Sequence, residues 1–330
     1  MLVFTRVWLA VGLLAGATGC ARREAATADS AAGGGNRRVV LQTDWFPQAE
    51  HGGFYQALAR GFYAQAGLAV EIWPGGPGAG IKLKVARGDA DFGMLRSDDL
   101  LLAASRGMPL TMVAATLQHD PLALMVHAGS PVTAFRHLEG RTVIGNVGMA
   151  WMPWLERRFG LKFEKRQNTY GLGDFLANPE LIQQCMVTNE PFFARQHGRP
   201  VRTLPLAAAG YDCYHVVFAR RELLRTSPDV VRAFVDASIR GWRDYLEGDP
   251  APADELILKR NAQMSRELLA FSRNELIQGR YVHGEPAKDE GIGRLSLERL
   301  AELMQTLIDL GVMEAPVPIT SVATQDFLPK

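Results

Sequence analysis

The sequence has few of the residues that indicate a disulfide-stabilised, metal-binding or nucleic-acid-binding protein. Its 330 residues include three cysteines, and the formal net charge is +1. No two cysteines have the C-x-x-C spacing, and no His/Cys cluster indicates a metal site. A charge so close to zero lacks the basic excess that neutralises nucleic-acid phosphates. We therefore expect neither a metal nor a nucleic-acid partner.

The sequence also lacks an apolar run long enough to span a bilayer. An apolar stretch near the amino terminus, Val7–Ala15, follows Arg6 and has the length of a signal-peptide core. The next residues, ATGC at 17–20, resemble the bacterial lipobox, in which the cysteine is lipidated. Leucine is commoner at the position of Ala17, and a plain signal peptide cut nearby is the alternative. Both interpretations predict export, and the first predicts a cell-envelope lipoprotein anchored to the membrane through Cys20.

Two expectations follow for the exported chain. Residues 1–20 would be the signal peptide. Residues 21–37 are small, polar and glycine-rich, a composition that cannot bury a core and predicts a flexible linker. Disulfides are permitted outside the cytoplasm. Cys185 and Cys213 could form one bridge or remain two buried thiols, because the sequence does not reveal their Cα spacing.

The rest of the chain alternates strands with helices, which predicts α/β lobes with mostly parallel, doubly wound sheets. A length of 330 residues suits two lobes better than one core. A polar stretch around Pro131 marks a boundary, and a strand expected at Asp212–Ala219 returns to the first lobe. We therefore expect one lobe from residues 38–128 and 217–330 and another from residues 129–216. Strands are expected at Val39–Leu41, Leu68–Ile72, Ala90–Leu95, Leu110–Leu117, Leu122–His127, Thr142–Gly145, Phe163–Gln167, Cys185–Val187 and Val201–Leu206, and helices at Ile81–Arg87, Asp98–Arg106, Ala150–Phe159, Pro191–Gln196 and Arg266–Gln278.

Asp44, Trp45 and His51 lie where the first strand is expected to end and the next helix to begin. Ligands of open α/β sheets bind at such carboxyl ends, so we expect these residues to form one wall of a small-molecule cleft. Trp45 would be an aromatic platform, with a core or lobe-packing position as the alternative. Asp44 would accept hydrogen bonds from the ligand or cap the turn. His51 would donate to the ligand or form a local hydrogen bond.

Two further segments of this lobe are candidates for ligand contact. Arg96, Ser97 and Asp98 stand between an expected strand and an expected helix. Arg96 could pair with an anionic ligand group or with the aspartate beside it. The glycine-rich segment 74–80 could bring backbone amides close to a ligand, with a tight turn as the alternative. It lacks the Lys-Ser/Thr that a nucleotide P-loop requires.

The second lobe offers a comparable set at its expected strand ends. Asn189 and Glu190 follow a strand and precede Pro191, so we expect the carboxylate to face the cleft. The alternative is a helix-start charge favoured by the helix macrodipole. Asn146 begins the corresponding turn, whose amides could hold an anion. Trp151 is a second stacking candidate, unless its helix belongs entirely to the core.

Several of these stretches together resemble one family. They are DWFP (residues 44–47), HGGFYQA (51–57), GFY (61–63), GDADFG (88–93), LEGRTV (138–143) and TNEPFF (188–193). Over about residues 38 to 328, the chain resembles the solute-binding proteins of ABC importers in the thiamine-pyrimidine-synthase-like and aliphatic-sulfonate-binding superfamily. The resemblance implies a type II periplasmic-binding-protein fold, in which two α/β lobes joined by two crossovers close on a ligand by hinge motion.

The same resemblance implies a function. The protein would bind a small heterocycle, a thiamine-precursor pyrimidine before others, and pass it as a monomer to an ABC permease and its ATPase without a cofactor. A receptor for riboflavin, or for an anion such as a sulfonate or nitrate, is the alternative. The anion alternative predicts that Arg96 and the Asn146 turn dominate affinity and that Trp45 contributes little.

The superfamily also contains enzymes that make the thiamine pyrimidine from pyridoxal phosphate and a histidine of their own chain. Their lysine and histidine correspond to Leu95 and Asp99 here, and their cysteine-rich motif corresponds to residues 210–215, which keep Cys213. A leucine cannot form a Schiff base, and an aspartate has no imidazole to donate. The resemblance therefore implies a receptor and not an enzyme.

Overall fold

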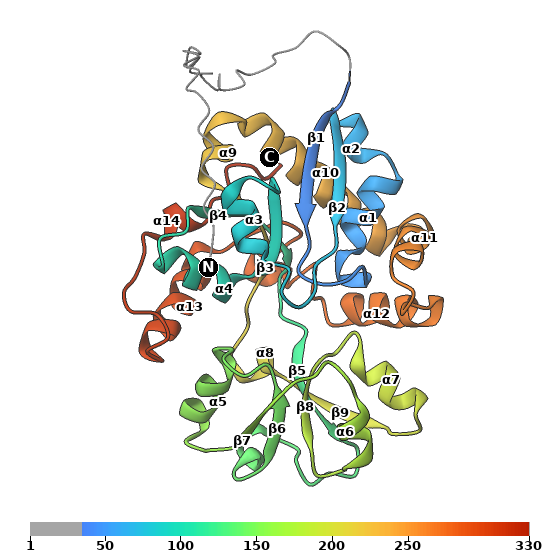
Figure 1. The fold of residues 1–330 in the computed structure, drawn as a ribbon, viewed down its shortest axis with the longest axis vertical. Helices are drawn as coiled ribbons and strands as arrows, with labels where there is room; N and C mark the ends of the chain where they lie inside the picture. Colours follow the sequence, from blue (N-terminus) through green and yellow to red (C-terminus); the bar gives the residue numbers. More distant parts are fainter. Residues whose placement is uncertain (1–34, 330) are drawn as a thin grey trace, which may run out of the picture. The chain divides into compact units, whose positions relative to one another are not determined.

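The computed structural model describes residues 35–329, which contain two five-stranded sheets (Figure 1). The strand order is β2-β1-β3-β10-β4 in the first sheet and β7-β6-β8-β5-β9 in the second. We call the parts of the chain built on these sheets lobe 1 and lobe 2. The strands are β1 (Arg37–Gln42), β2 (Leu68–Trp73), β3 (Phe92–Arg96), β4 (Leu110–Leu117), β5 (Leu122–His127), β6 (Thr142–Gly145), β7 (Glu164–Gln167), β8 (Ile182–Met186), β9 (Val201–Pro205) and β10 (His215–Arg220).

Each sheet has four strands that run in one direction and one reversed strand, in agreement with the mostly parallel sheets that we predicted. Strands β1, β2 and β3 are parallel, as are β6, β7 and β8, but β10 runs antiparallel to β3 and β4. In the same way β5 runs antiparallel to β8 and β9. Each of these reversed strands enters its sheet directly from the other lobe. It therefore has no crossover helix of its own to turn it parallel to its neighbours.

The lobe boundary also differs from the prediction. The expected limit at residue 128 would leave β5 in lobe 1, yet β5 pairs with β8 and β9 inside the second sheet. The first crossover is therefore residues 118–121, between β4 and β5, and the second is residues 210–214, which precede β10. A short apolar run predicts a buried strand without showing which sheet the strand joins.

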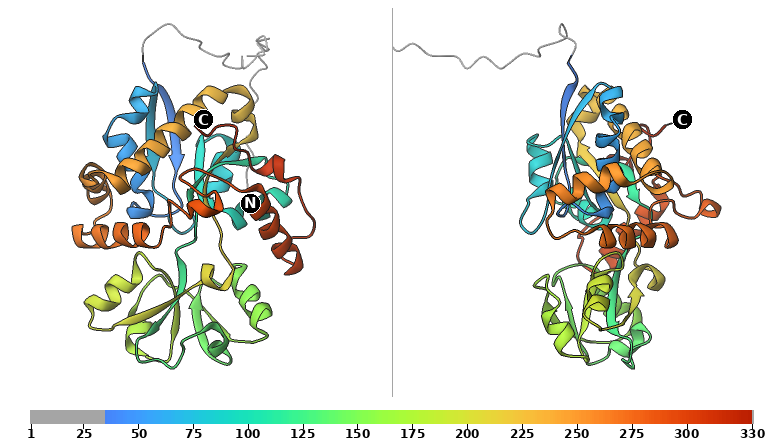
Figure 2. Two further views of the ribbon diagram at one scale, coloured as in Figure 1. Left: turned by 180° about the vertical axis from the view of Figure 1, so that it is seen from behind. Right: turned by 90° about the vertical axis from the view of Figure 1, so that its right-hand side faces the viewer.

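Helices cover both faces of the lobe 1 sheet. In β1, Val39 and Leu41 face a core shared with α1 and α10, whereas Val40 faces a core shared with α3 and α4. Burial on both faces is typical of parallel βαβ units, and Figure 2 shows α10 lying across the rear face. The helices of this lobe are η1 (Ala49–His51), α1 (Gly52–Ala59), α2 (Phe62–Gln65), α3 (Ile81–Arg87), α4 (Ser97–Ser105), α9 (Arg221–Thr226), α10 (Pro228–Glu247), α11 (Ala251–Arg260), α12 (Arg266–Gln278), η3 (Pro286–Lys288), α13 (Leu297–Asp309) and α14 (Ile319–Val322).

The lobe 2 sheet is covered in the same way. In its interior strand β5, Ala123 and Met125 pack with α6 and α7, whereas Leu124 and Val126 pack on the face that carries α5. Strand β5 is consequently apolar except for its last residue, His127, and is buried throughout. The helices of this lobe are η2 (Phe135–Leu138), α5 (Trp151–Phe159), α6 (Gly173–Ala177), α7 (Glu190–Gln196) and α8 (Leu206–Ala209).

The predicted amino-terminal features lie almost entirely outside the described residues. These are the signal peptide, the lipidation site Cys20 and the linker up to residue 34. The last predicted linker residue, Arg37, already belongs to β1, where it pairs with Leu68. Within residues 35–329, no helix has both the length and the apolarity that crossing a bilayer requires.

Candidate functional site

Asp44 follows β1 in a turn where two histidines meet its carboxylate. The Oδ1 atom is 2.8 Å from His51 Nε2, and Oδ2 is 3.7 Å from His215 Nδ1. Both histidine side chains are buried, whereas the Asp44 side chain is 21% exposed. The carboxylate is therefore held by two buried imidazoles while part of it stays accessible.

The two histidines keep the Asp44 carboxylate ionised. Burial alone would raise the pKa of Asp44, but contacts with His215 and His51 outweigh burial and hold that pKa well below its ordinary value. Burial would lower the pKa of His215, but Asp120, 3.3 Å from Nε2, and Asp44 raise it to about 9. At neutral pH an ionised Asp44 therefore lies beside a protonated His215, whose two ring nitrogens both carry a proton.

We predict that the free energy of unfolding falls as the pH rises from about 6.5 to about 9. Folding raises the pKa of His215 from 6.5 to about 9. The stabilisation is complete below the unfolded-state pKa and is lost as the pH rises through the folded-state value. Its magnitude is on the order of 3 kcal/mol. Urea unfolding at a series of pH values measures it.

His215→Gln is the control for this pH dependence. Burial also raises the pKa of the Cys185 and Cys213 thiols, and this lowers stability at alkaline pH in both proteins. The difference between wild type and His215→Gln removes that common contribution. If the two proteins show the same pH dependence, His215 is not the titrating group.

Arg96, at the end of β3, is surrounded by partners inside the protein. Its Nε and Nη2 donate to the two Asp98 oxygens at 3.2 and 3.1 Å, and its Nη1 donates to Asp120. Nη2 also lies 3.3 Å from Cys213 Sγ, and Asp98 accepts from the Tyr211 hydroxyl at 2.7 Å. The Arg96 side chain is 8% exposed and that of Asp120 is fully buried. The guanidinium is therefore neutralised, and most of its N–H groups are bonded, without a ligand.

This network connects lobe 1 to both crossovers. Asp120 belongs to the first crossover and Tyr211 to the second. Ser97 makes a similar connection, because its Oγ accepts from the Tyr214 backbone N–H at 3.1 Å. We predicted ligand contact for Arg96–Asp98, but all three side chains are buried between the sheet and the crossovers. The pairing of Arg96 with Asp98 is the alternative that we gave from the sequence. The partners Asp120, Tyr211 and Tyr214 come from segments distant in sequence, which local spacing does not reveal.

Trp45 is partly exposed, beside Asp44 in the same turn. Its ring centroid lies 5.6 Å from that of Phe46, with 75° between the planes, and 5.0 Å from that of Tyr170, with 49° between the planes. Tyr170 belongs to lobe 2, in the segment between β7 and α6. Trp45 is thus not a core residue, and stacking on a ligand and packing between the lobes both remain available to it.

The turn after β6 has fewer free amides than we predicted. The Asn146 N–H donates to Gln184 Oε1 at 2.9 Å, and the Val147 N–H donates to Gln167 Oε1 at 3.1 Å. Glutamine side chains therefore occupy the amides proposed for an anion. The Asn146 Oδ1 atom is buried and has no hydrogen-bond partner among the described residues. A buried acceptor of this kind suits a donor on a ligand.

Trp151, the second stacking candidate, is fully buried. It begins α5 and belongs to the same core cluster as Met152 and Leu155 of that helix. The first turn of α5 thus packs its apolar residues on the sheet. The structure places Trp151 in the core, which is the alternative that its apolar neighbours indicated.

The turn after β8 touches lobe 1 directly. The Thr188 hydroxyl donates to the Glu50 carboxylate, and the Thr188 carbonyl accepts from Ser272 Oγ at 2.6 Å. Two residues further, Glu190 begins α7 and its Oε2 accepts from the Met186 N–H at 2.8 Å. Burial and the neighbouring Glu50 carboxylate raise the pKa of Glu190 to about 7. Glu190 is therefore partly protonated near neutral pH.

Asn189 and Glu190 differ in whether their side chains already form hydrogen bonds inside the protein. One Glu190 oxygen closes the turn onto the end of β8, which agrees in part with the helix-start alternative. Asn189 is the N-cap of α7 but makes no side-chain capping bond. Both residues are partly exposed. Both remain candidates for ligand contact, and Asn189 is the one whose side chain makes no capping bond.

The HGG motif at residues 51–53 contains glycine because two helices approach closely. A Cβ on Gly53 would lie 2.2 Å from the Trp242 ring of α10. Only a residue without a side chain allows α1 to pack this near. His51 caps the start of α1 and is fully buried, so this packing fixes the imidazole that holds Asp44. The local-bond alternative for His51 is the one observed.

The glycine-rich segment 74–80 packs on the turn after β1. The Gly75 N–H donates to the Trp45 carbonyl at 2.9 Å. A Cβ on Gly75 would lie 2.3 Å from the Thr43 carbonyl oxygen, so only glycine fits there. The segment therefore supports the Asp44 turn, in agreement with the tight-turn alternative.

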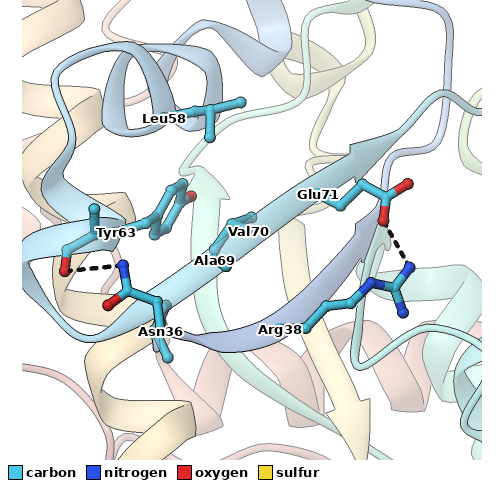
Figure 3. A pocket seen from close by; sticks show the side chains of 9 residues that line it. Asn36, Arg38, Leu58, Tyr63, Ala69, Val70 and Glu71 are labelled. Carbon is cyan, nitrogen blue, oxygen red and sulfur yellow. Dashed lines mark hydrogen bonds and ion pairs between the residues drawn. The ribbon is translucent and has the colours of Figure 1, made fainter. Parts of the chain in front are cut away.

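A separate cavity of about 450 Å³ lies elsewhere on lobe 1 (Figure 3). Its lining includes Asn36, Arg38 and Leu68, at the amino-terminal ends of β1 and β2, the opposite end of these strands from Asp44. Arg38 and Glu71 form an ion pair of 2.6 Å there, but both are largely exposed and such pairs contribute little. This cavity lacks the buried charges that surround Asp44, so we do not place the ligand in it.

Four residues of the site were not predicted from the sequence: Glu50, Asp120, Tyr170 and His215. Tyr170 follows a strand in the same way as Trp45, so the strand-end rule would have found it. The other three are buried ionisable groups whose partners lie on other elements. Among the described residues, no group of His, Cys, Asp or Glu is arranged to hold a metal, and Cys185 and Cys213 are free and buried.

The sequence profile of the NMT1/THI5-like family matches residues 48–253, more than half of the chain. The chain belongs to this family. The riboflavin-binding protein RibY of Chloroflexus aurantiacus is 22% identical over 316 residues, which cover 89% of this chain and 86% of the relative. A 4-amino-5-hydroxymethyl-2-methylpyrimidine phosphate synthase of Saccharomyces cerevisiae is 26% identical over 253 residues, which cover 70% and 73%.

Solved structures agree on the fold of this NMT1/THI5-like chain. The periplasmic sulfonate-binding protein SsuA of Methylobacillus flagellatus superposes with a TM-score of 0.64 at 13% identity, over 89% of this chain and 93% of its own. At this identity the likeness concerns the fold alone. The predicted type II periplasmic-binding-protein fold is confirmed.

Proposed function

We propose that this protein is the exported solute-binding component of an ABC importer and that it binds an amino-substituted heterocycle, a thiamine-type pyrimidine before others. The observation that carries the proposal is the ionised, partly exposed Asp44 carboxylate beside the partly exposed indole of Trp45. A carboxylate accepts hydrogen bonds from ring amino groups, and an indole stacks on a flat ring. Membership of the NMT1/THI5-like family supports a ligand of this kind.

An anionic ligand would find few donors in this part of the protein. The Arg96 guanidinium is already paired with Asp98 and Asp120, and glutamine side chains occupy the two amides after β6. The available groups are acceptors instead, namely Asp44 and the unpartnered Asn146 Oδ1. A sulfonate or nitrate offers acceptors only, so we favour a ligand rich in N–H donors over both anions.

Riboflavin is the second candidate, because the relative named for riboflavin binding aligns with 89% of this chain. It shares a flat, nitrogen-rich ring system with the pyrimidine, and the same aromatic platform could hold it. The two candidates differ in size, since one has a single ring and the other has three fused rings.

We propose a receptor without a catalytic role. Leu95 lies within β3 and cannot form a Schiff base, and the Asp99 carboxylate lies 3.3 Å from Lys82 Nζ in an ion pair. The receptor would act as a monomer and deliver its ligand to a permease and its ATPase. A lipid on Cys20 would hold it at the membrane after removal of the residues that precede this cysteine.

Isothermal titration calorimetry on the purified protein tests the ligand assignment. We expect saturable heat with 4-amino-5-hydroxymethyl-2-methylpyrimidine or its formylamino relative, and less or none with ethanesulfonate or nitrate. Thiamine and riboflavin complete the panel. Absence of heat with all four heterocycles would refute the vitamin assignment, and heat with ethanesulfonate alone would establish the anion alternative.

A further inference from the structure

Large apolar side chains are exposed at strand ends in both lobes. Phe46 follows β1, Val147 follows β6 and Tyr170 follows β7, and these side chains are 44%, 50% and 52% exposed. Two other exposed apolar residues, Leu83 and Phe159, lie on helices. Exposed apolar groups that gather at one place usually mark a binding surface. These three gather at the strand ends that carry the candidate site.

Tyr170 is the most unusual of the three because of its backbone. Its φ is +63°, a left-handed conformation that glycine or asparagine adopts with less strain. Asn168 stabilises this conformation, because its Oδ1 accepts from the Tyr170 N–H at 2.8 Å. A strained backbone at a large aromatic residue is a reason to propose a functional role for that residue.

The Tyr170 ring meets Trp45 across the two lobes. The ring centroids are 5.0 Å apart and the planes differ by 49°. Phe46 contacts the Trp45 ring edge-on, with 75° between the planes. The indole is thus supported within its own lobe by Phe46 and faced from lobe 2 by Tyr170.

We propose that Tyr170 and Trp45 form an aromatic clamp that holds the planar ring of the ligand between the lobes. The proposal rests on the function proposed above and narrows its ligand class to flat heteroaromatic rings. Stacking distances are about 3.5 Å, so an inserted ring needs the two side chains roughly 7 Å apart. Gly171 and Gly173 follow Tyr170 with no atoms crowding them, so the segment has room for this shift.

Tyr170→Asn is the decisive variant, because it separates binding from stability. Asparagine tolerates a positive φ, so we expect the melting temperature to stay constant or rise. We expect affinity for 4-amino-5-hydroxymethyl-2-methylpyrimidine or riboflavin, whichever the wild type binds, to fall about ten-fold or more. Tyr170→Phe retains the ring and should bind within about three-fold of wild type. Phe159→Ala, which removes an exposed aromatic ring elsewhere in lobe 2, should leave affinity unchanged.

Calorimetry with these variants distinguishes failure of the aromatic clamp from failure of the proposed function. If the wild type binds a probe and Tyr170→Asn binds it equally well, the clamp is refuted and the proposed function stands. If the wild type binds none of the four heterocycles of the panel, both proposals fall. If Tyr170→Phe loses as much affinity as Tyr170→Asn, the hydroxyl and not the ring is responsible, and the stacking role is refuted.

Discussion

Asp44→Asn is expected to weaken binding of 4-amino-5-hydroxymethyl-2-methylpyrimidine roughly ten- to a hundred-fold. A hydrogen bond to a charged group contributes roughly 1.5–3 kcal/mol, which corresponds to this change in affinity. The amide also replaces one acceptor oxygen with a donor, and that donor would face the ring amino group. Calorimetric titration near neutral pH, where wild-type Asp44 is ionised, measures the effect.

Two further variants make this result interpretable. Trp45→Ala should also weaken binding, because it removes the stacking surface. Asp99→Asn removes a carboxylate of lobe 1 that is 43% exposed and paired with Lys82, so it should leave affinity unchanged. Circular dichroism checks the fold, since Asp44 also contacts His215. Wild-type affinity in both the Asp44 and the Trp45 variants would show that the ligand binds elsewhere.

Arg96→Leu is expected to destabilise the protein by about 3–5 kcal/mol. The substitution leaves the buried Asp98 and Asp120 carboxylates without their cation, and removing one partner of a buried pair has this magnitude. Arg96→Lys should be intermediate, because an ammonium keeps the charge but cannot form the guanidinium fork. Urea unfolding followed by circular dichroism gives the free energies.

Arg141→Leu is the matched control for Arg96. Arg141 pairs with Glu180 at 2.7 Å on the surface, where the Glu180 side chain is 69% exposed. Pairs of this kind contribute about 1 kcal/mol or less. If Arg96→Leu were as stable as Arg141→Leu and lost affinity for a sulfonate, Arg96 would be an anion-binding residue and the proposed ligand class would be wrong.

Local periodicity was sufficient to find several elements of this fold. Strands at Leu110–Leu117, Leu122–His127 and Thr142–Gly145 and helices at Ile81–Arg87 and Arg266–Gln278 have the predicted bounds. Each is defined by apolar spacing and by turn or capping residues within a few positions. Their pairing was harder to predict. The directions of β5 and β10, and the sheet that β5 joins, depend on where the crossovers lead.

The same distinction, between what local sequence indicates and what tertiary contacts decide, applies to the residues of the candidate site. The strand-end rule selected Asp44 and Trp45 as candidates, because both follow β1 directly in the chain. It identified Arg96 equally well, and there it was misleading. Asp120 and Tyr211 come from the two crossovers and complete the network around the guanidinium. Most of its N–H groups are therefore already bonded inside the protein.

The sequence by itself determined the element order, the family resemblance and the residues delivered to the strand ends, because all of these are recorded in short stretches of chain. Only the tertiary structure decided which of those residues stay accessible. Charge, burial and hydrogen bonding depend on partners that folding brings together from distant segments. The two histidines hold Asp44 as an accessible carboxylate, whereas Asp98 and Asp120 enclose Arg96 at the end of the neighbouring strand β3.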